Sequence, residues 1–157
     1  MAISQKLISF FKKNKTKYEV LKHKTVYTAY DKAATLRVPE KIVGKTLLVR
    51  LDKDPALVLI PANKNLDKQK LKKLAKAKTV DFIKEAWMKK RLKGVKVGAV
   101  PPFGNLWKLP TFVDRALINQ SKIIINGGDY NYSIKINPAV FKKIIPDLVI
   151  GNFSKKK

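Results

Sequence analysis

The stretch KTLLVRLDKDPALVLIP, residues 45–61, predicts the centre of the fold. Residues 45–51 have the pattern of a β-strand, the DKDP segment is a turn signal, and residues 56–61 are the expected hairpin partner. Both strands are almost entirely apolar, as is typical of strands that are covered on both faces. We therefore expect this hairpin at the centre of a sheet, with the other elements packed around it.

Weaker patterns on both sides of the hairpin predict short helices and strands. Helices are expected at residues 4–14, 28–36, 67–74, 83–92 and 139–145, and strands at 18–21, 80–82, 111–113, 122–125 and 132–136. Ser4, Thr28 and Asn137 are the expected N-caps of three helices, and Leu71 and Leu74 the inward side chains of a fourth. The basic residues 154–157 are expected to fray. These patterns predict one α/β domain, of the α+β type, that spans residues 1–157.

The charge of the chain is its strongest compositional signal. Among 157 residues, 35 are Lys or Arg and 11 are Asp or Glu, which gives a formal net charge of +24. Like charges at this density repel one another and destabilise the folded chain, and proteins usually carry such an excess because it attracts a polyanion. Nucleic acid is therefore the expected partner. Two alternatives stay open: a lysine-rich proteome that raises the count everywhere, and an anionic membrane surface.

The composition also excludes several kinds of chemistry. The chain has no cysteine, so disulfides, thiolate zinc sites and a cysteine nucleophile are ruled out. It has no metal-binding pattern, nucleophile elbow or glycine-rich nucleotide motif, so we expect neither a metal nor a cofactor. The one histidine, His23, lies apart from any carboxylate cluster, and a histidine in such a position more often has a structural role than a catalytic one. No apolar run is long enough for a membrane span or a signal peptide, which predicts a cytoplasmic protein without membrane contact.

The segment KVGAVPPFGNLWKLP, residues 96–110, is stiff and apolar at the same time. Its glycines and prolines prevent a regular helix or strand, yet Val97, Val100 and Trp107 are not residues of a solvated loop. Two interpretations are evenly balanced: a buried crossover between strands, and the wall of a binding pocket. In the second, Gly98 lets the backbone approach a ligand and the prolines hold the chain in place.

Four further positions are candidates for chemistry, each with a plainer alternative. Lys45 begins an apolar strand, where its ammonium can serve a phosphate or a carbonyl oxygen, or be one surface lysine among many. Asp114 can orient a group in a pocket or cap a helix. Gly127 and Gly128 form a hairpin turn or a phosphate nest. The basic helix at residues 67–74 is a solvated face or a contact for a nucleic acid backbone.

Several of these motifs recur together, in order and at matching spacing, in a known family. The chain resembles the YbaK/prolyl-tRNA synthetase-associated domain family, the aminoacyl-tRNA deacylases that edit mischarged tRNA, over residues 10–145. The motifs that carry the resemblance are TAYDKAA (28–34), KTLLV (45–49), LVLIP (57–61), LD (66–67), VGAVPPFG (97–104), LPTFVD (109–114) and GG (127–128).

The resemblance implies a fold, an activity and a site. The fold is a mixed, mostly antiparallel, barrel-like sheet with flanking helices. The activity is hydrolysis of the ester that joins a wrong amino acid to the 3′-terminal adenosine of tRNA, here expected to be a small amino acid on tRNA for proline. The family's critical lysine falls on Lys45, with an electrostatic role, and its glycine–proline loop falls on Gly98 and Pro102. The remaining expected substrate contacts are Thr28, Ala99, Val100, Pro101, Phe103, Gly104, Asp114, Gly127 and Gly128.

The resemblance also bears on partners and on alternatives. We expect a free-standing monomer that acts on mischarged tRNA, with or without an aminoacyl-tRNA synthetase as a second partner. The segment GGDYNYSIKI departs from the family because Tyr130 and Tyr132 stand where many relatives have a glycine-rich or basic turn. Two other functions stay open: a non-catalytic RNA-binding protein with the same fold, and a basic protein that binds a small molecule. The first structural expectation is that the Lys45 ammonium and the backbone of residues 98–102 face one concave pocket.

Overall fold

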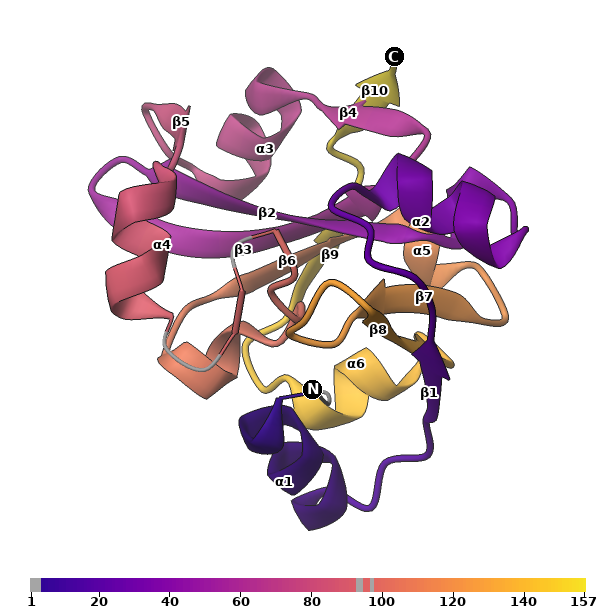
Figure 1. Cartoon of the computed structure of the whole chain (residues 1–157). Coiled ribbons are helices and arrows are strands. Elements are labelled where there is room, and N and C mark those ends of the chain that lie inside the picture. Colours follow the sequence, from indigo (N-terminus) through magenta and orange to yellow (C-terminus); the bar gives the residue numbers. More distant parts are fainter. Residues whose placement is uncertain (1–3, 93–94, 97) are drawn as a thin grey trace.

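The computed structural model describes residues 4–92, 95–96 and 98–157 and is shown in Figure 1. The helices are α1 (Gln5–Lys13), α2 (Ala29–Leu36), α3 (Lys68–Ala75), α4 (Glu85–Arg91), α5 (Arg115–Ile118) and α6 (Val140–Ile144), with 3-10 turns η1 (Glu40–Ile42) and η2 (Gly104–Trp107). The strands are β1 (Glu19–Lys22), β2 (Gly44–Leu51), β3 (Asp54–Pro61), β4 (Lys64–Leu66), β5 (Val80–Phe82), β6 (Thr111–Asp114), β7 (Ile123–Asn126), β8 (Tyr132–Ile136), β9 (Val149–Gly151) and β10 (Ser154–Lys156). Every element predicted from the sequence is confirmed to within two residues.

The predicted hairpin forms the middle of a five-stranded sheet with the order β5-β2-β3-β6-β9. β2 and β3 pair antiparallel along their whole length, around a turn in which Asp52 has a φ of +57°. β3 is covered on both faces, as predicted. Val58 and Ile60 pack in one hydrophobic cluster, and Leu57 and Leu59 pack in two others. Because each of these side chains is fully buried, each stabilises the fold by roughly 1.5–3 kcal/mol.

The remaining strands form two smaller sheets, so the fold is mixed and mostly antiparallel. β1, β8 and β7 make an antiparallel three-stranded sheet, and β10 pairs with β4. Only β3–β6 and β6–β9 are parallel pairs among the described residues. The resemblance implied a barrel-like sheet, but the described strands do not close into a barrel. In the part of the chain that the structure describes, the large sheet and the three-stranded one are joined by one isolated parallel bridge, between Val43 and Ile124, instead of by continuous strand pairing.

Helix caps explain where some helices begin and correct two predictions. Thr28 caps α2 as predicted, because its hydroxyl accepts the N–H of Asp31 at 3.0 Å. Ser4 occupies the N-cap position of α1, but its side chain makes no capping hydrogen bond, and its own N–H donates to Gly127 O instead. Asn137 does not cap α6: helix α6 begins at Val140, and the Asn137 side chain accepts the N–H of Ala139 two residues on.

Two further predictions differ from the structure, one in α3 and one at residues 154–157. Leu71 of α3 is fully buried, but Leu74 is 37% exposed, although its side chain lies against Gly151 of β9. Residues 154–157 were expected to fray, yet Ser154–Lys156 form β10 and pair with β4. Backbone pairing outweighs the like charges there, and Phe153, just before β10, is fully buried and anchors the segment.

The stiff segment that follows α4 lies largely in the core. Phe103 is fully buried and contacts Phe11 and Phe141 with ring centroids 5.4 Å apart in both pairs. Val100 and Trp107 belong to a second cluster under α4. Gly104 is buried as well, and its N–H donates to the Thr111 hydroxyl at 2.9 Å. This part of the segment therefore joins α1, α6 and the large sheet.

We predict that Gly104→Ala destabilises the protein by about 3 kcal/mol, because a Cβ there collides with rigid neighbours. It would contact the Leu109 carbonyl oxygen and lie 2.6 Å from the Thr111 hydroxyl. Urea unfolding measures the cost. The matched variant is Gly98→Ala, where the nearest atom is 3.7 Å from the added Cβ and only the φ of +85° is unfavourable, at about 1 kcal/mol. Equal costs for the two variants would contradict the prediction.

Candidate functional site

A cavity of about 210 Å³ opens beside the start of β2. Four segments line it: the approach to α2, the first residues of β2, the loop after α4 and the end of β7. Its lining residues are Tyr27, Thr28, Ala29, Gly44, Lys45, Thr46, Gly98 and Asn126. Lys45, Thr28 and Gly98, which the sequence singled out separately, therefore lie in one cavity.

Lys45 enters this cavity from the second position of β2. Gly44 precedes it because a Cβ at residue 44 would lie 2.9 Å from the buried side chain of Leu59. The ammonium of Lys45 is partly buried and donates to the carbonyl of Lys64 at 3.0 Å. Burial lowers the pKa of Lys45, and the nearby charge of Lys157 lowers it further. Within the described residues no carboxylate pairs with it, so its charge is available to a ligand.

Asn126, at the end of β7, is a site residue that sequence reasoning missed. Its Oδ1 accepts a 2.6 Å hydrogen bond from the ammonium of Lys32 in α2. Because an ammonium only donates, this bond fixes the orientation of the amide. The Nδ2 group then faces the carbonyls of Val100 (3.2 Å) and Gly98 (3.4 Å) and the hydroxyl of Thr46 (3.5 Å). One amide thus holds the loop after α4 against β2, β7 and α2.

Lys32 was also missed, and its environment is unusual for a lysine. It is 6% exposed, and burial lowers the pKa of its ammonium to about 8. The signal was present in the sequence, because residues 29, 32, 33 and 36 share the inward face of a helix at 28–36. A buried cation next to the cavity makes this end of the domain electropositive.

The loop after α4 contributes less to the cavity than its motif suggested. Gly98 lines the cavity, but residues 99–104 are buried: Ala99, Val100, Pro101, Pro102, Phe103 and Gly104. Val97, the first residue of the motif, lies outside the described residues. Both interpretations of the segment hold in part, because Gly98 belongs to the wall and the residues after it form a buried crossover. The expectation that residues 98–102 all face the cavity is met by Gly98, while Val100 reaches it through its carbonyl bond to Asn126.

The remaining predicted contacts lie outside the cavity lining. Asp114 caps α5, accepting the N–H of Ala116 at 2.9 Å, and its other oxygen accepts the N–H of Phe153. Gly127 and Gly128 lie in the connection from β7 to β8, with Gly128 at a φ of +100°. Their backbone groups are already bonded, because Gly128 N–H donates to Ala99 O and the Gly127 carbonyl accepts from the chain near the N-terminus. These contacts favour the plainer alternatives, a helix cap and a turn.

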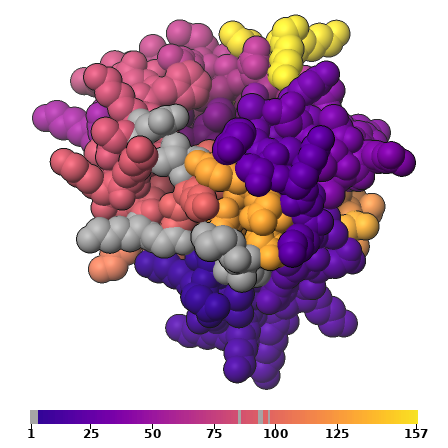
Figure 2. Space-filling view, in the orientation of Figure 1, coloured from indigo at the N-terminus to yellow at the C-terminus, as the bar shows by residue number. Residues whose placement is uncertain are grey.

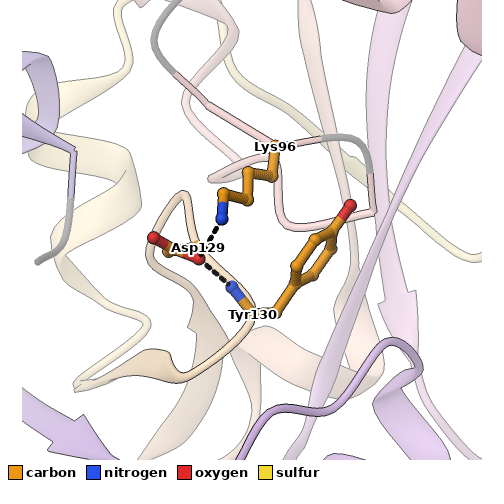
Figure 3. Close-up of polar contacts among 3 residues, drawn as sticks. All are labelled: Lys96, Asp129 and Tyr130. Carbon is orange, nitrogen blue, oxygen red and sulfur yellow. Dashed lines mark hydrogen bonds and ion pairs between the residues drawn. The ribbon is translucent and has the colours of Figure 1, made fainter. Parts of the chain in front are cut away.

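Beside the cavity, the β7–β8 connection is held to the loop after α4 by an ion pair (Figure 3). Lys96 and Asp129 lie 3.2 Å apart, and Asp129 also accepts the N–H of Tyr130 at 2.7 Å. Figure 2 shows this connection (orange) at the surface, between the segment that leads into α2 (violet) and the segment around α4 (salmon). Tyr130 and Gly98 are therefore neighbours, with a Cβ at residue 98 placed 3.9 Å from the Tyr130 ring.

His23 has a structural position. Its Nδ1 lies 2.8 Å from the carbonyl of Lys24, so it donates there, and its Nε2 accepts from the buried Ser133 hydroxyl at 2.8 Å. Burial lowers the pKa of His23, and the charge of Lys32 adds to this effect. The imidazole thereby links the end of β1 to β8, and it is not among the residues that line the cavity.

Comparison with known proteins identifies the family. The model of the aminoacyl-tRNA editing domain matches residues 23–144, a span that contains the whole cavity lining. The chain belongs to the aminoacyl-tRNA editing domain family. This confirms the resemblance seen in the sequence motifs, and membership implies a mischarged aminoacyl-tRNA as substrate.

Solved structures agree with this membership. The structure of hypothetical protein APE2540 is 25% identical, with a TM-score of 0.86 over 96% of this chain and 100% of that chain. A structure described as that of a proposed trans-editing enzyme for prolyl-tRNA synthetase is 18% identical, with a TM-score of 0.80 over 96% of both chains. At that identity the second likeness shows the fold alone.

A larger, strongly basic cavity of about 510 Å³ lies elsewhere, lined by Lys6, Lys90, Arg91, Leu106, Trp107 and Lys108, and it contains none of the predicted site residues. Within the described chain, every helix is too short or too polar to cross a membrane.

We predict that Lys32 makes the stability of this domain rise with pH between about 8 and 10.5. In that window the unfolded chain keeps the Lys32 proton, whose ordinary pKa is 10.5, while the folded chain has lost it. The free energy of unfolding therefore increases with pH, by up to roughly 3 kcal/mol. Urea unfolding at several pH values should show that, as the pH rises through this window, the free energy of unfolding of wild type increases by this amount relative to that of Lys32→Met. The control is Lys41→Met, at an exposed lysine, whose free energy of unfolding should differ from that of wild type by the same amount at every pH. The same pH-independent difference for Lys32→Met would contradict the prediction.

Proposed function

We propose that this editing domain acts as a free-standing enzyme that deacylates mischarged tRNA, and that its substrate is tRNA of the proline type with a small wrong amino acid. In the reaction, water adds to the aminoacyl carbonyl carbon and the bond from that carbon to the ribose oxygen breaks. The ribose oxygen takes the proton, which leaves free amino acid and uncharged tRNA. The observation that carries the proposal is the cavity in which Lys45 and Gly98 meet in a member of this family.

Lys45 is proposed to act by charge. Its ammonium stands in a partly buried cavity, where a positive charge stabilises the developing oxyanion of the ester or a phosphate of the 3′-end more strongly than in water. An aminoacyl ester is already activated, so a positioned water suffices as nucleophile without a nucleophilic side chain. This fits a chain without cysteine, whose only histidine is bonded to Ser133 and Lys24.

The size of the cavity supports a small aminoacyl group. A volume of about 210 Å³ lies below the roughly 300 Å³ at which drug-sized ligand pockets begin. The walls are held by Asn126 and Lys32, so the cavity does not widen without breaking buried hydrogen bonds. Because one methylene is worth only about 1–3 kcal/mol in such a pocket, this rigidity is the proposed source of discrimination.

The net charge of +24 supports tRNA as the partner. An RNA acceptor stem presents a dense array of phosphates, and lysines that neutralise them release counterions. Binding to tRNA is therefore expected to weaken steeply as salt rises.

The decisive experiment is hydrolysis of a panel of mischarged tRNAs by wild type and Lys45→Ala, followed as loss of the aminoacyl label. We predict that Lys45→Ala lowers the rate by about 100- to 1,000-fold, as loss of one oxyanion-stabilising group does, while tRNA binding persists. The matched control is Lys53→Ala, which removes the same charge from the exposed turn at the other end of β2. Its rate should equal that of wild type.

Other outcomes of the panel are equally informative. Full activity of Lys45→Ala would overturn the assignment of the site, even if the activity stood. Tight, salt-sensitive binding without hydrolysis of any panel member would instead identify a non-catalytic RNA-binding protein. If the protein neither binds nor hydrolyses any member of the panel, the remaining alternative is a basic protein that binds a small molecule.

A further inference from the structure

Tyr27 lines the cavity and is nevertheless 66% exposed, the largest exposed fraction among the large apolar and aromatic side chains of the described residues. A side chain that is both a wall of the cavity and open to solvent stands at its mouth. A tyrosine there presents a flat apolar surface in a strongly basic protein, which is the combination used to hold the bases of single-stranded nucleic acids.

The Tyr27 ring is held in place from behind. It packs against Tyr130 with ring centroids 4.8 Å apart and planes at 65°, and the neighbouring Val26 N–H donates to the Tyr130 carbonyl at 3.0 Å. Tyr130 is fixed in turn by Asp129, as Figure 3 shows, and the ammonium of Lys96 lies 5.5 Å from the centre of its ring. Since a preset ring loses little entropy on binding, this support favours Tyr27 as a docking surface.

The cavity volume determines which part of the substrate reaches this ring. About 210 Å³ accommodates a small aminoacyl group but not the nucleoside attached to it. When the aminoacyl group is inside and its carbonyl is near Lys45, the adenosine must remain at the mouth, where Tyr27 lies.

We propose that Tyr27 is a stacking platform for the 3′-terminal adenine of the tRNA. Tyr130 and the Lys96–Asp129 pair are positioning residues that hold the platform at the cavity mouth. The proposal rests on the proposed function for the identity of the ligand. It adds a subsite for a nucleobase to a cavity that otherwise recognises only the ester and the amino acid.

The test measures binding, without hydrolysis, of the trinucleotide cytidine–cytidine–adenosine to the full chain. Tyr27→Ala should weaken binding by about 5- to 100-fold, the range for one lost base-stacking contact, while Tyr27→Phe should stay close to wild type. The matched control is Tyr30→Ala, because Tyr30 is 60% exposed, follows three residues later and does not line the cavity. It should bind like wild type.

A second ligand separates stacking from a general loss of structure. With a trinucleotide whose last nucleotide lacks its base, wild type and Tyr27→Ala should bind equally weakly. An equal loss for both ligands, unchanged binding by Tyr27→Ala, or no binding of the complete trinucleotide to wild type at millimolar concentration would each overturn the proposal. Binding of the trinucleotide is measured separately from hydrolysis of mischarged tRNA. Stacking without deacylase activity would overturn the proposed function alone, and deacylase activity without stacking would overturn the proposal for Tyr27 alone.

Discussion

The candidate site depends on the hydrogen bonds that the side-chain amide of Asn126 makes. It receives a hydrogen bond from Lys32 and donates toward the carbonyls of Gly98 and Val100, so it connects α2, β7 and the loop after α4 at one point. Those segments are far apart in the sequence, and among the described residues the two sheets they flank share one isolated bridge. Side-chain hydrogen bonds therefore hold these segments together, whereas backbone pairing between strands holds the segments of each sheet together.

The same arrangement builds one wall of the cavity from polar contacts instead of apolar packing. A buried lysine is costly, and it is tolerated here because the asparagine oxygen satisfies it. Removing Asn126 would take away the hydrogen bond of the buried Lys32 ammonium, and removing Lys32 would leave the Asn126 Oδ1 without its donor. The chain therefore keeps a cation beside the cavity and obtains a fixed wall from the same contact.

Much of the fold could be predicted from the sequence, because the decisive signals are local. The apolar hairpin in residues 45–61 and the Thr28 cap need only neighbouring residues to be recognised, and both are confirmed. The short strands β4, β9 and β10 were not predicted, and β10 was expected to fray, because three residues with no clear alternation carry little local signal. The site was predictable only where a motif carried it: Lys45 was found, whereas Asn126 and Lys32 matter because residues 94 apart in the chain meet, and no local pattern records that meeting.

The pairing of β10 with β4 has a consequence for how this domain could be joined to others. Lys156 lies opposite Lys64, whose carbonyl accepts the hydrogen bond of the Lys45 ammonium, and the charge of Lys157 reaches Lys45. The C-terminal strand thus ends beside the cavity. A module fused there would be tethered close to the cavity, at a high effective concentration relative to any ligand bound in it. Fusion at this end would couple a second activity to substrate capture through chain connectivity alone.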